Sequence, residues 1–539
     1  MRVLPTLSLL LAILPLLASC GRAVPTAAPL ETDASPASAS DAVDWWREVV
    51  FYEIFVRSFY DSDGDGIGDF NGVTEKLDYL QDLGIGGIWL MPIHPSPSYH
   101  GYDVVNYYAV NPDYGTMNDF RRLLDEAHKR DIRVIIDLVL NHTSSQHPFF
   151  RAALDPSSPY RDWYIWSTEK PDWGNWHAAQ PDGPYYYGFF CDCMPDLNYA
   201  NPEVTAQMEN VVHYWLDQGV DGFRLDAIKH LFEEAGRVEN APAMHDWLED
   251  FYSDYKAISD ETYTVGEVYS AGAFVARTYE GQTDHIFNFE LAGGIVNSVN
   301  GGSNTGLTSA YTFTLPEMPD GDYATFLTNH DQNRVMSVLR GNTAKAKVAA
   351  TLLLTAPGTP FIYYGEEIGM TGAKPDELIR TPMQWSAGAN AGFTTGTPWE
   401  MPNTDYAQGV NIAAQVDDPA SLLSHYRALI AMRTSHSALR TGNTLIFETA
   451  NKGLFASLRV DGTEAILVLV NLTEAPISDY ALSLKSSPLE PGQYDLLSLL
   501  GGGEFSPLSV NEGGKVTGFV PLVEVPAYAT LILILSPIQ

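Results

Sequence analysis

Residues 220–226 read Val-Asp-Gly-Phe-Arg-Leu-Asp (VDGFRLD), a short strand-like run that ends in an acidic residue. Side chains alternate between the two faces of a strand, so Arg224 and Asp226 are expected to lie on the same side. A guanidinium at that spacing can hold the carboxylate ionised and oriented. Asp226 is therefore a candidate nucleophile at the end of a predicted strand.

Similar β-rich runs recur along the chain and alternate with helical patterns, which predicts a parallel α/β architecture. We expect strands near residues 50–56, 85–91, 132–139, 220–226, 262–267, 284–289, 324–329 and 359–364. Eight strands with helices between them predict a closed (β/α)8 TIM barrel. In such a barrel the reactive groups lie at the carboxyl ends of the strands.

The predicted barrel is divided in sequence and comprises residues 44–141 and 202–436. Residues 142–201 are rich in Trp, Tyr, Pro and Gly and are too long for an ordinary connection, so we expect an inserted subdomain after the third strand. From residue 437 the pattern changes to alternating strands without helices between them. Residues 437–539 are therefore predicted to form a C-terminal all-β sandwich domain.

The first twenty residues have the pattern of an export signal. Arg2 precedes an apolar run that is too short for a comfortable membrane span, and the run ends in Leu17-Ala18-Ser19-Cys20. That ending resembles the lipobox of bacterial lipoproteins, which implies cleavage before Cys20, lipidation of its thiol and export to the cell envelope. The alternative is an ordinary signal peptide with an incidental cysteine. Residues 21–43 have the composition of a flexible linker.

The charge balance limits the classes of partner. With 31 basic and 67 acidic residues the formal net charge is −36. Such a chain would repel nucleic acid and anionic lipid surfaces, so we expect no nucleic-acid partner and membrane contact only through the lipid anchor at Cys20. An uncharged ligand is more plausible. The charge itself can also serve solubility or adaptation to high salt.

Two more carboxylates follow predicted strands. Glu267 ends the fifth strand in an apolar setting that would raise its pKa and suit a general acid. Asp331 follows the seventh strand. A single acidic residue after a strand is more often a helix cap. Three of them at the same end of one barrel favour a catalytic site instead.

Four segments in this order resemble the α-amylase superfamily of retaining glycoside hydrolases. Residues 137–142 (DLVLNH) resemble the family's first characteristic region, the Asp226 segment the second, Glu267 the third and residues 329–331 (NHD) the fourth. The resemblance covers roughly residues 45–539. It implies hydrolysis of α-glucosidic bonds in an α-glucan such as starch.

The resemblance implies a role for each residue that stands at a matching position of the family's characteristic regions. The resemblance implies that Asp226 is the nucleophile, Glu267 the general acid/base and Asp331 a third carboxylate that grips sugar hydroxyls in the transition state. The substrate-binding residues that it implies are His100, Tyr102, Asp103, His142, Arg224, Lys229, His230 and His330. The alternative for each of the lining residues is ordinary packing.

Specificity within the family is indicated by two short segments. Residues 194–198 (MPDLN) resemble a form intermediate between the oligo-1,6-glucosidase and neopullulanase types, which also occurs in trehalose synthase-like chains. Lys229-His230 resembles the pair that contacts the leaving-group side of a long glucan in α-amylases. This pair favours an endo-acting α-amylase. Oligo-1,6-glucosidase, neopullulanase or cyclomaltodextrinase, and trehalose synthase-like activities remain alternatives, as does a non-catalytic relative.

Residues 61–69 (DSDGDGIGD) have the alternating acidic pattern of a Ca²⁺ loop, in which Gly66 permits a sharp turn. The later bidentate Glu of an EF-hand is missing. A similar loop holds calcium in relatives. The resemblance implies ligands from the side chains of Asp61, Asp63, Asp65 and Asp69 and from the carbonyl of Ile67. A solvated acidic turn is the alternative.

Two cysteines remain apart from Cys20. Cys191 and Cys193 are separated by one residue, a spacing that strains a bridge between them. Without further Cys or His ligands they make a poor zinc site. The sequence leaves free thiols and a strained disulfide both open.

Overall fold

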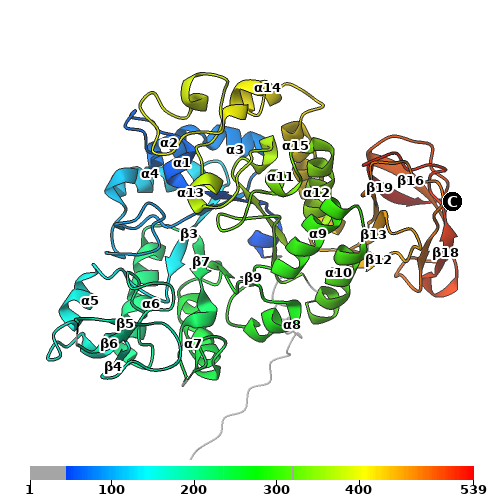
Figure 1. Ribbon diagram of the computed structural model, residues 1–539. Helices are drawn as coiled ribbons and strands as arrows, with labels where there is room; N and C mark the ends of the chain where they lie inside the picture. The colour runs from blue at the N-terminus through cyan, green and yellow to red at the C-terminus, as the bar shows by residue number, and fades with distance from the viewer. Residues whose placement is uncertain (1–43, 182, 235, 319–320, 463, 539) are drawn as a thin grey trace, which may run out of the picture. The chain divides into compact units, whose positions relative to one another are not determined.

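The computed structural model describes residues 44–539, apart from residues 182, 235, 319–320, 463 and 539 (Figure 1). The predicted signal segment, the lipidation site at Cys20 and the linker of residues 21–43 lie outside the described residues. Within the part that is described, no helix combines the length and the apolar character needed to cross a membrane.

Eight parallel strands form the barrel. They are β1 (Phe51–Ile54), β2 (Gly87–Leu90), β3 (Arg133–Val139), β7 (Gly222–Asp226), β8 (Tyr263–Gly266), β9 (His285–Ile286), β10 (Ala324–Thr325) and β11 (Thr359–Tyr363). Their order is β10-β11-β1-β2-β3-β7-β8-β9, and a parallel bridge between Phe287 and Ala324 connects its two ends. The predicted (β/α)8 barrel is confirmed, with each strand inside its expected range.

Helices follow the strands and surround the barrel (Figure 1). The longer ones are α3 (Leu77–Leu83), α4 (Met117–His128), α6 (Pro202–Asp217), α7 (Pro242–Ile258), α9 (Phe289–Gly301), α10 (Thr305–Glu317), α12 (Thr343–Thr355) and α15 (Leu422–Ser435). The shorter ones are α1 (Val56–Phe59), α2 (Phe70–Glu75), α5 (Pro148–Ala153), α8 (Ala273–Ala276), α11 (Val335–Val338), α13 (Asp376–Ile379), α14 (Ile412–Gln415) and α16 (Ser437–Arg440).

Helix α4 illustrates why these segments are helical. It begins at a capping box, in which Thr116 and Asp119 each bond the other's backbone N–H. Its buried residues recur at helical spacing and face the barrel: Phe120, Leu123, Leu124 and Ala127. Strand β3, by contrast, is buried at every position after Arg133, as expected for a strand covered on both faces.

The insertion after β3 forms its own small sheet, as Figure 1 shows in cyan. Its antiparallel strands are β4 (Trp166–Ser167), β5 (Trp176–Ala178) and β6 (Tyr185–Tyr187), in the order β4-β6-β5. The aromatic residues that are frequent here pack mainly on one another. Trp176 and Tyr187, for example, have ring centroids 5.3 Å apart.

The C-terminal region is an antiparallel β domain, also as predicted. A six-stranded sheet contains β12 (Asn443–Ile446), β13 (Leu454–Val460), β14 (Ala465–Asn471), β19 (Thr530–Pro537), β16 (Gly492–Leu500) and β17 (Leu508–Val510), in that order. A second sheet pairs β15 (Leu482–Leu484) with β18 (Val516–Phe519). Leu467 on β14 shares one apolar cluster with Leu482 and Phe519. The alternate side chains of β14, such as Val468, join the cluster of the barrel.

Candidate active site

Arg224 lies at the centre of a cluster of carboxylates at the carboxyl ends of β3, β7 and β8. Its side chain is 1% exposed, and its Nη1 donates to Asp226 Oδ1 at 2.5 Å. Nη1 also reaches both oxygens of Asp137, at 3.0 and 3.1 Å. Nη2 lies 3.2 Å from Glu267 Oε2. One guanidinium therefore contacts three acids, as the alternation of β7 predicted for the pair Arg224 and Asp226.

Register explains how Asp137 reaches this cluster. Asp137 on β3 is the direct parallel partner of Arg224 on β7. Burial raises the pKa of Asp137 to about 7, although Arg224 opposes that shift. Burial also opposes the charge of Arg224, but Asp137 and the other acids around it keep its pKa well above the ordinary value. The guanidinium therefore stays charged beside Asp226.

Glu267 directly follows β8, and its carboxylate turns toward β7. Its Oε2 accepts a 3.0 Å hydrogen bond from the backbone N–H of Ala227. Burial raises the pKa of Glu267; Arg224 lowers it, and the charges of Asp226 and Asp331 raise it. A carboxyl whose pKa is raised stays protonated to higher pH, which suits a general acid. Ala227 itself has a φ of 49°, a left-handed conformation that is strained for a residue with a Cβ.

Asp331 lies between two cationic partners. Arg380 Nη2 donates to Asp331 Oδ1 at 2.9 Å, and His330 Nε2 lies 3.3 Å from Asp331 Oδ2. Burial opposes ionisation of Asp331, yet His330 and Arg380 lower its pKa overall. Behind His330, Glu53 accepts from Nδ1 at 2.5 Å. Asp331 is thus held as a carboxylate.

The other predicted substrate residues lie on the loops above β2 and β3. Tyr102 contacts His330 Nε2 at 2.6 Å and donates to Asp137 at 3.1 Å. His142 contacts the carbonyl of Tyr102 at 3.2 Å, and burial lowers its pKa to about 4. His100 contacts the hydroxyl of Ser98 at 3.1 Å.

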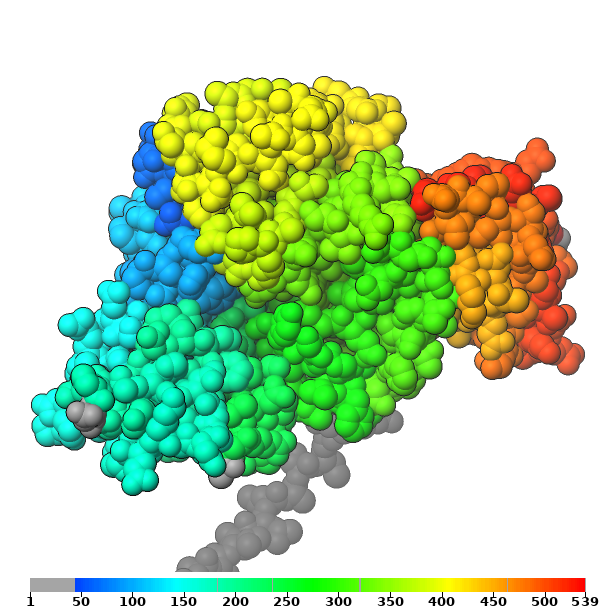
Figure 2. Space-filling view, viewed as in Figure 1, coloured from blue at the N-terminus to red at the C-terminus, as the bar shows by residue number. Residues whose placement is uncertain are grey.

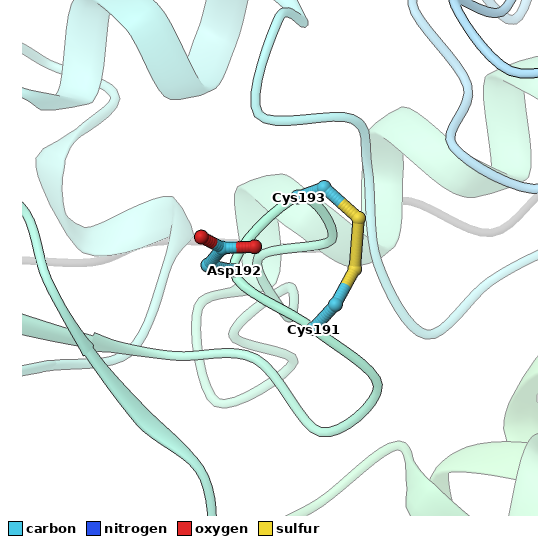
Figure 3. A group of neighbouring side chains, drawn as sticks. All are labelled: Cys191, Asp192 and Cys193. Carbon is cyan, nitrogen blue, oxygen red and sulfur yellow. A yellow bond between two sulfur atoms is a disulfide. The ribbon is translucent and has the colours of Figure 1, made fainter.

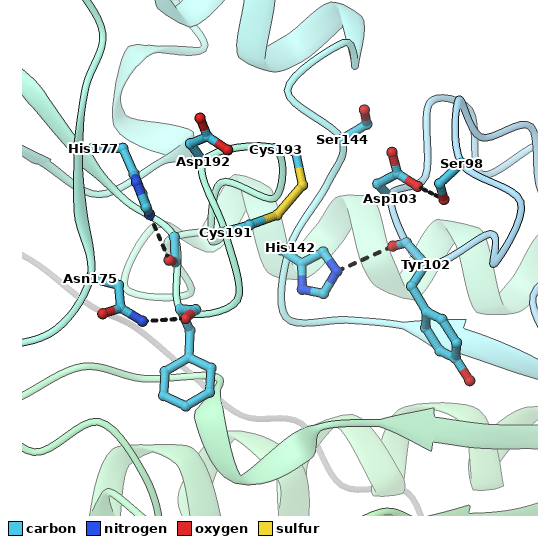
Figure 4. Close-up of a disulfide and its surroundings, with 12 residues drawn as sticks. Ser98, Tyr102, Asp103, His142, Ser144, Asn175, His177, Cys191, Asp192 and Cys193 are labelled. Carbon is cyan, nitrogen blue, oxygen red and sulfur yellow. Dashed lines mark hydrogen bonds between the residues drawn. A yellow bond between two sulfur atoms is a disulfide. The ribbon is translucent and has the colours of Figure 1, made fainter. Parts of the chain in front are cut away.

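The hydrogen bonds of the Asp103 side chain go to its own loop and not to the carboxylate cluster. Its Oδ1 accepts from Ser96 at 2.6 Å and also from Ser98, so its described partners belong to its own loop. Figure 4 shows this Ser98–Asp103 contact to one side of Tyr102. Asp103 therefore orders the loop that presents Tyr102 and His100.

An open cavity of about 400 Å³ extends outward from Glu267. Its lining residues are Phe189, Phe190, Ala227, Lys229, His230, Glu239, Glu267, Tyr269, Asp331 and Lys374. Lys229 forms an ion pair with Glu239 at 2.9 Å and donates to the carbonyl of Tyr269 at 3.2 Å. His230 Nδ1 contacts the carbonyl of Val238 at 2.7 Å. We refer to this cavity as the outer cleft.

The long segment 371–411 and the insertion both contribute to the molecular surface in the view of Figure 2, where they are yellow and cyan. A second cavity of similar volume lies among residues that precede β1, β9 and β10, including Trp46, Asp284 and Glu317. Two of its acids form ion pairs, Asp284 with Lys256 and Glu317 with Arg277. It contains none of the predicted catalytic groups, so the outer cleft is the candidate site.

Several residues of the site were not predicted from the sequence, and only one of them has a clear signal there. Glu53 is a charged residue within the buried strand β1, and that mismatch could have identified it. Arg380 follows the short helix α13 in a long irregular segment. Phe190 and Tyr269 are 46% and 44% exposed, but exposure is not visible in a sequence.

The acidic loop after α1 folds tightly around Asp61. Asp61 Oδ1 accepts from the backbone of Gly64 at 2.7 Å, and Oδ2 accepts from that of Gly66 at 2.7 Å. Gly66 has a φ of 98°, and a Cβ there would lie 1.9 Å from a backbone carbonyl oxygen. Only glycine fits this turn. Asp69 Oδ1 caps helix α2 by accepting from Gly72 at 2.7 Å.

The loop meets the geometric requirement for a cation. Carboxylate oxygens of Asp61, Asp63 and Asp65 lie within 4.8 Å of one another. Oxygens bound to one Ca²⁺ at about 2.3–2.6 Å are at most about 5 Å apart, so these three can share an ion. Burial raises the pKa of Asp65, and the charge of Asp63 raises it further. A bound cation would relieve that repulsion.

Two buried side-chain oxygens lie where the chain after β3 meets the insertion. They are Asn141 Oδ1 and Asp196 Oδ2, and the side chains of Asn141 and Glu233 interact with Asp196. The backbone of residues 141 and 197 is directly bonded at 2.9 Å, which brings the two segments together. Burial raises the pKa of Asp196 to about 7. Oxygen atoms of this kind are suited to a hard cation.

Comparison with known proteins gives a consistent result. The family model described as "Alpha amylase, catalytic domain" matches residues 53–442. "Alpha-amylase 3" of Dictyoglomus thermophilum is 42% identical over 436 residues, which cover 79% of this chain and 85% of that protein. An "Oligo-1,6-glucosidase" of Heyndrickxia coagulans is 34% identical over 522 residues, which cover 81% of this chain and 93% of the relative.

A solved structure shows the same fold over nearly the whole chain. The crystal structure of an α-amylase from H. orenii superposes with a TM-score of 0.77 at 41% sequence identity. The match covers 90% of this chain and 99% of that chain. Relatives named for different activities thus share the sequence family, and the α-amylase structure shares the fold.

Proposed function

The chain belongs to the α-amylase catalytic-domain family of glycoside hydrolases, and from that premise we propose that it is a retaining, endo-acting α-amylase. Its substrates would be the α-1,4-glucosidic bonds of starch, glycogen and maltooligosaccharides. The proposal rests on one observation: the buried guanidinium of Arg224 contacts both Asp226 and Glu267. A retaining mechanism needs two carboxyl groups that are close together but in different protonation states.

The two carboxyl groups have different environments. Asp226 accepts from a charged guanidinium and therefore stays available as the nucleophile that attacks C1 of the sugar. Glu267, whose pKa is raised by burial, donates its proton to the departing glycosidic oxygen. The same group then removes a proton from water as the water oxygen bonds to C1 and the bond between C1 and Asp226 breaks, which frees the sugar from the enzyme.

Asp331 and His330 would bind the sugar ring that is cleaved. Their carboxylate and imidazole lie 3.3 Å apart, and Arg380 holds the carboxylate from its other side. Charged acceptors and donors fixed in this way need no rearrangement as positive charge develops on the ring. Their hydrogen bonds to sugar hydroxyls would then strengthen in the transition state.

The outer cleft supports endo action. It contains Glu267, the proposed acid, and continues past it to Lys229 and His230. A sugar chain on the leaving-group side would occupy this space. An exo-acting glucosidase would need space on this side only for a short leaving group. Because the chain is also similar to an oligo-1,6-glucosidase, that activity is the competing candidate.

We further propose that Ca²⁺ binds the loop of Asp61, Asp63 and Asp65, with Asp69 and the carbonyl of Ile67 completing the ligand set. The oxygen cluster described above supports the roles of Asp61, Asp63 and Asp65, whereas those of Asp69 and Ile67 rest on the sequence pattern. The ion would neutralise the acidic loop and stabilise the region that follows β1. It would take no part in the glycosidic chemistry.

Export and lipidation at Cys20 are a separate proposal, supported by the Leu-Ala-Ser-Cys pattern. Expression in a bacterial host with radiolabelled palmitate should label the full chain in the membrane fraction. Cys20→Ala should abolish the label. An unlabelled parent chain would overturn the proposal.

A product assay tests the function directly. Incubation with maltose, isomaltose, starch and maltohexaose, followed by chromatography, separates the candidates. Shortened maltooligosaccharides from starch and no product from maltose support the α-amylase. Glucose from isomaltose would favour oligo-1,6-glucosidase, and trehalose from maltose would favour an isomerase.

A further inference from the structure

The disulfide between Cys191 and Cys193 lies directly beside the outer cleft. The structure joins the two sulfurs and so resolves the alternatives left open by the sequence. One carboxylate oxygen of Asp192 lies within 4.8 Å of both sulfurs (Figure 3). The residue before this small ring is Phe190, which lines the cleft with 46% of its side chain exposed.

The neighbours of Phe190 are held firmly from both sides. Phe189 donates its N–H to Asp196 at 3.0 Å and accepts from Asn175 at 2.5 Å. The carbonyl of Cys193 accepts from the backbone of Ser145 at 2.8 Å. Asp192 is fixed as well, because its carbonyl accepts from Tyr186 at 2.6 Å.

Phe190 itself is held differently. Neither its N–H nor its carbonyl has a hydrogen-bond partner among the described residues. Its ring packs edge-on against His142 at 5.1 Å and against His230 at 6.0 Å. The disulfide ring begins at Cys191 and restricts the backbone of that residue, to which the Phe190 carbonyl is directly joined.

The cleft is lined by a second exposed aromatic ring. Tyr269, 44% exposed, follows Glu267 by two residues and lines the same cavity. Large exposed aromatic rings inside a cavity mark a ligand site, because burying them against a ligand face is favourable. The cavity extends from Asp331, which would bind the ring that is cleaved, past Glu267, which acts on the leaving group, to Lys229 and His230, whereas Asp226 does not line it.

We propose that Phe190 is a stacking platform for a glucose ring on the leaving-group side of the cleft, and that the Cys191–Cys193 disulfide positions it. This inference rests on the proposed function, since it assigns the side on which Glu267 acts. Phe190 is thus a specificity-determining residue. Cys191 and Cys193 are positioning residues that act through it. Figure 4 places the disulfide next to His142, which in turn contacts Tyr102.

Two substrates separate the contribution of Phe190 on the leaving-group side from the rest of catalysis. Maltohexaose fills both sides of the scissile bond, whereas α-maltosyl fluoride has no sugar on the leaving-group side. Phe190→Ala should lower kcat/KM for maltohexaose by about tenfold. It should leave kcat/KM for α-maltosyl fluoride within about twofold of the parent. Phe190→Trp, which keeps a flat ring, should restore most of the loss.

Phe274→Ala is the matched control, because Phe274 is 75% exposed on α8 and does not line the cleft. It should behave like the parent on both substrates. An equal loss on both substrates for Phe190→Ala, or no loss on either, overturns the platform. If the parent chain hydrolyses neither substrate, the proposed function itself fails, which is a different outcome.

Reduction tests the disulfide. Dithiothreitol should lower kcat/KM of the parent for maltohexaose in the same selective way as Phe190→Ala, but by a smaller factor. Cys191→Ser/Cys193→Ser should show that loss without reductant and should not respond to it. A double variant that matches the oxidised parent on maltohexaose would overturn the positioning role.

Discussion

The backbone N–H of Ala227 donates a 3.0 Å hydrogen bond to Glu267 Oε2. Ala227 is the residue after Asp226, so this bond joins the two proposed catalytic carboxyls through a single peptide unit. The strained φ of 49° at Ala227 is part of that arrangement. Displacement of the end of β7 or of β8 would therefore change the distance and orientation between the nucleophile Asp226 and the acid Glu267.

The acid role of Glu267 predicts a dependence on the leaving group. Glu267→Gln should lose at least about a hundredfold in kcat on maltooligosaccharides, because an amide cannot protonate the departing oxygen. On α-maltosyl fluoride, whose leaving group needs less protonation, the loss should be much smaller. Steady-state kinetics on both substrates measure this difference. Equal losses would argue against the acid role.

The pH profile should reflect the environment of Glu267. Burial and the charges of Asp226 and Asp331 raise its pKa, so activity should persist above the ordinary pKa of a glutamate and fall as pH rises through the raised value. Asp331→Asn removes one of those charges. The alkaline limb of kcat/KM in that variant should move to lower pH. A limb that stays in place would contradict the electrostatic coupling.

Lys229 and His230 should matter most for long substrates. Both line the outer cleft, and burial lowers the pKa of His230, which keeps its imidazole neutral at pH 7. Lys229→Met/His230→Leu should raise KM for maltoheptaose more than for maltotriose, since only the longer chain fills this side. An effect independent of chain length would remove the support for endo action.

The proposed calcium loop predicts a metal-dependent stability. A ligand that binds only the folded state stabilises it in proportion to the logarithm of its concentration relative to Kd. Chelation should therefore lower the Tm before it lowers activity at mild temperature. Asp63→Ala should have most of that effect, whereas Glu169→Ala, an exposed acid of the insertion, should not. An unchanged Tm after exhaustive chelation would mean that the loop is only an acidic turn and holds no structural calcium.

Most of the barrel could be predicted because its strands are short apolar runs bounded by turns, and all eight lie where expected. The pairing of Arg224 with Asp226 followed from strand alternation alone. Contacts between distant segments could not be predicted in this way. Glu53 behind His330 and Arg380 beside Asp331 come from different parts of the chain, and only the closed barrel brings them together.

The residues of the outer cleft could also be predicted only in part, because they come from distant segments. Lys229 and His230 were expected there from their place after Asp226, but the ring of Phe190 comes from the insertion. The state of Cys191 and Cys193 was open because spacing alone does not fix the conformation of the loop between them. Its hydrogen bond to Ser145 depends on a segment that is remote in the sequence.

The central claim is that Asp226 forms a covalent bond with the sugar. Asp226→Asn should fold and bind maltooligosaccharides but turn them over at least about a thousandfold more slowly, because an amide is a very poor nucleophile. Kinetics on the purified variant, with circular dichroism as the folding control, give this number.

The most direct measurement is capture of the intermediate. A maltosyl fluoride with a further fluorine on the reacting ring should react so that fluoride leaves C1 as a carboxylate oxygen bonds to it, and the electron-poor ring should slow release by water. Mass spectrometry of the digested protein should find one glycosyl unit on the peptide that contains Asp226, and none in Asp226→Asn. Turnover of this reagent without any adduct, or an adduct on another carboxylate, would contradict the account.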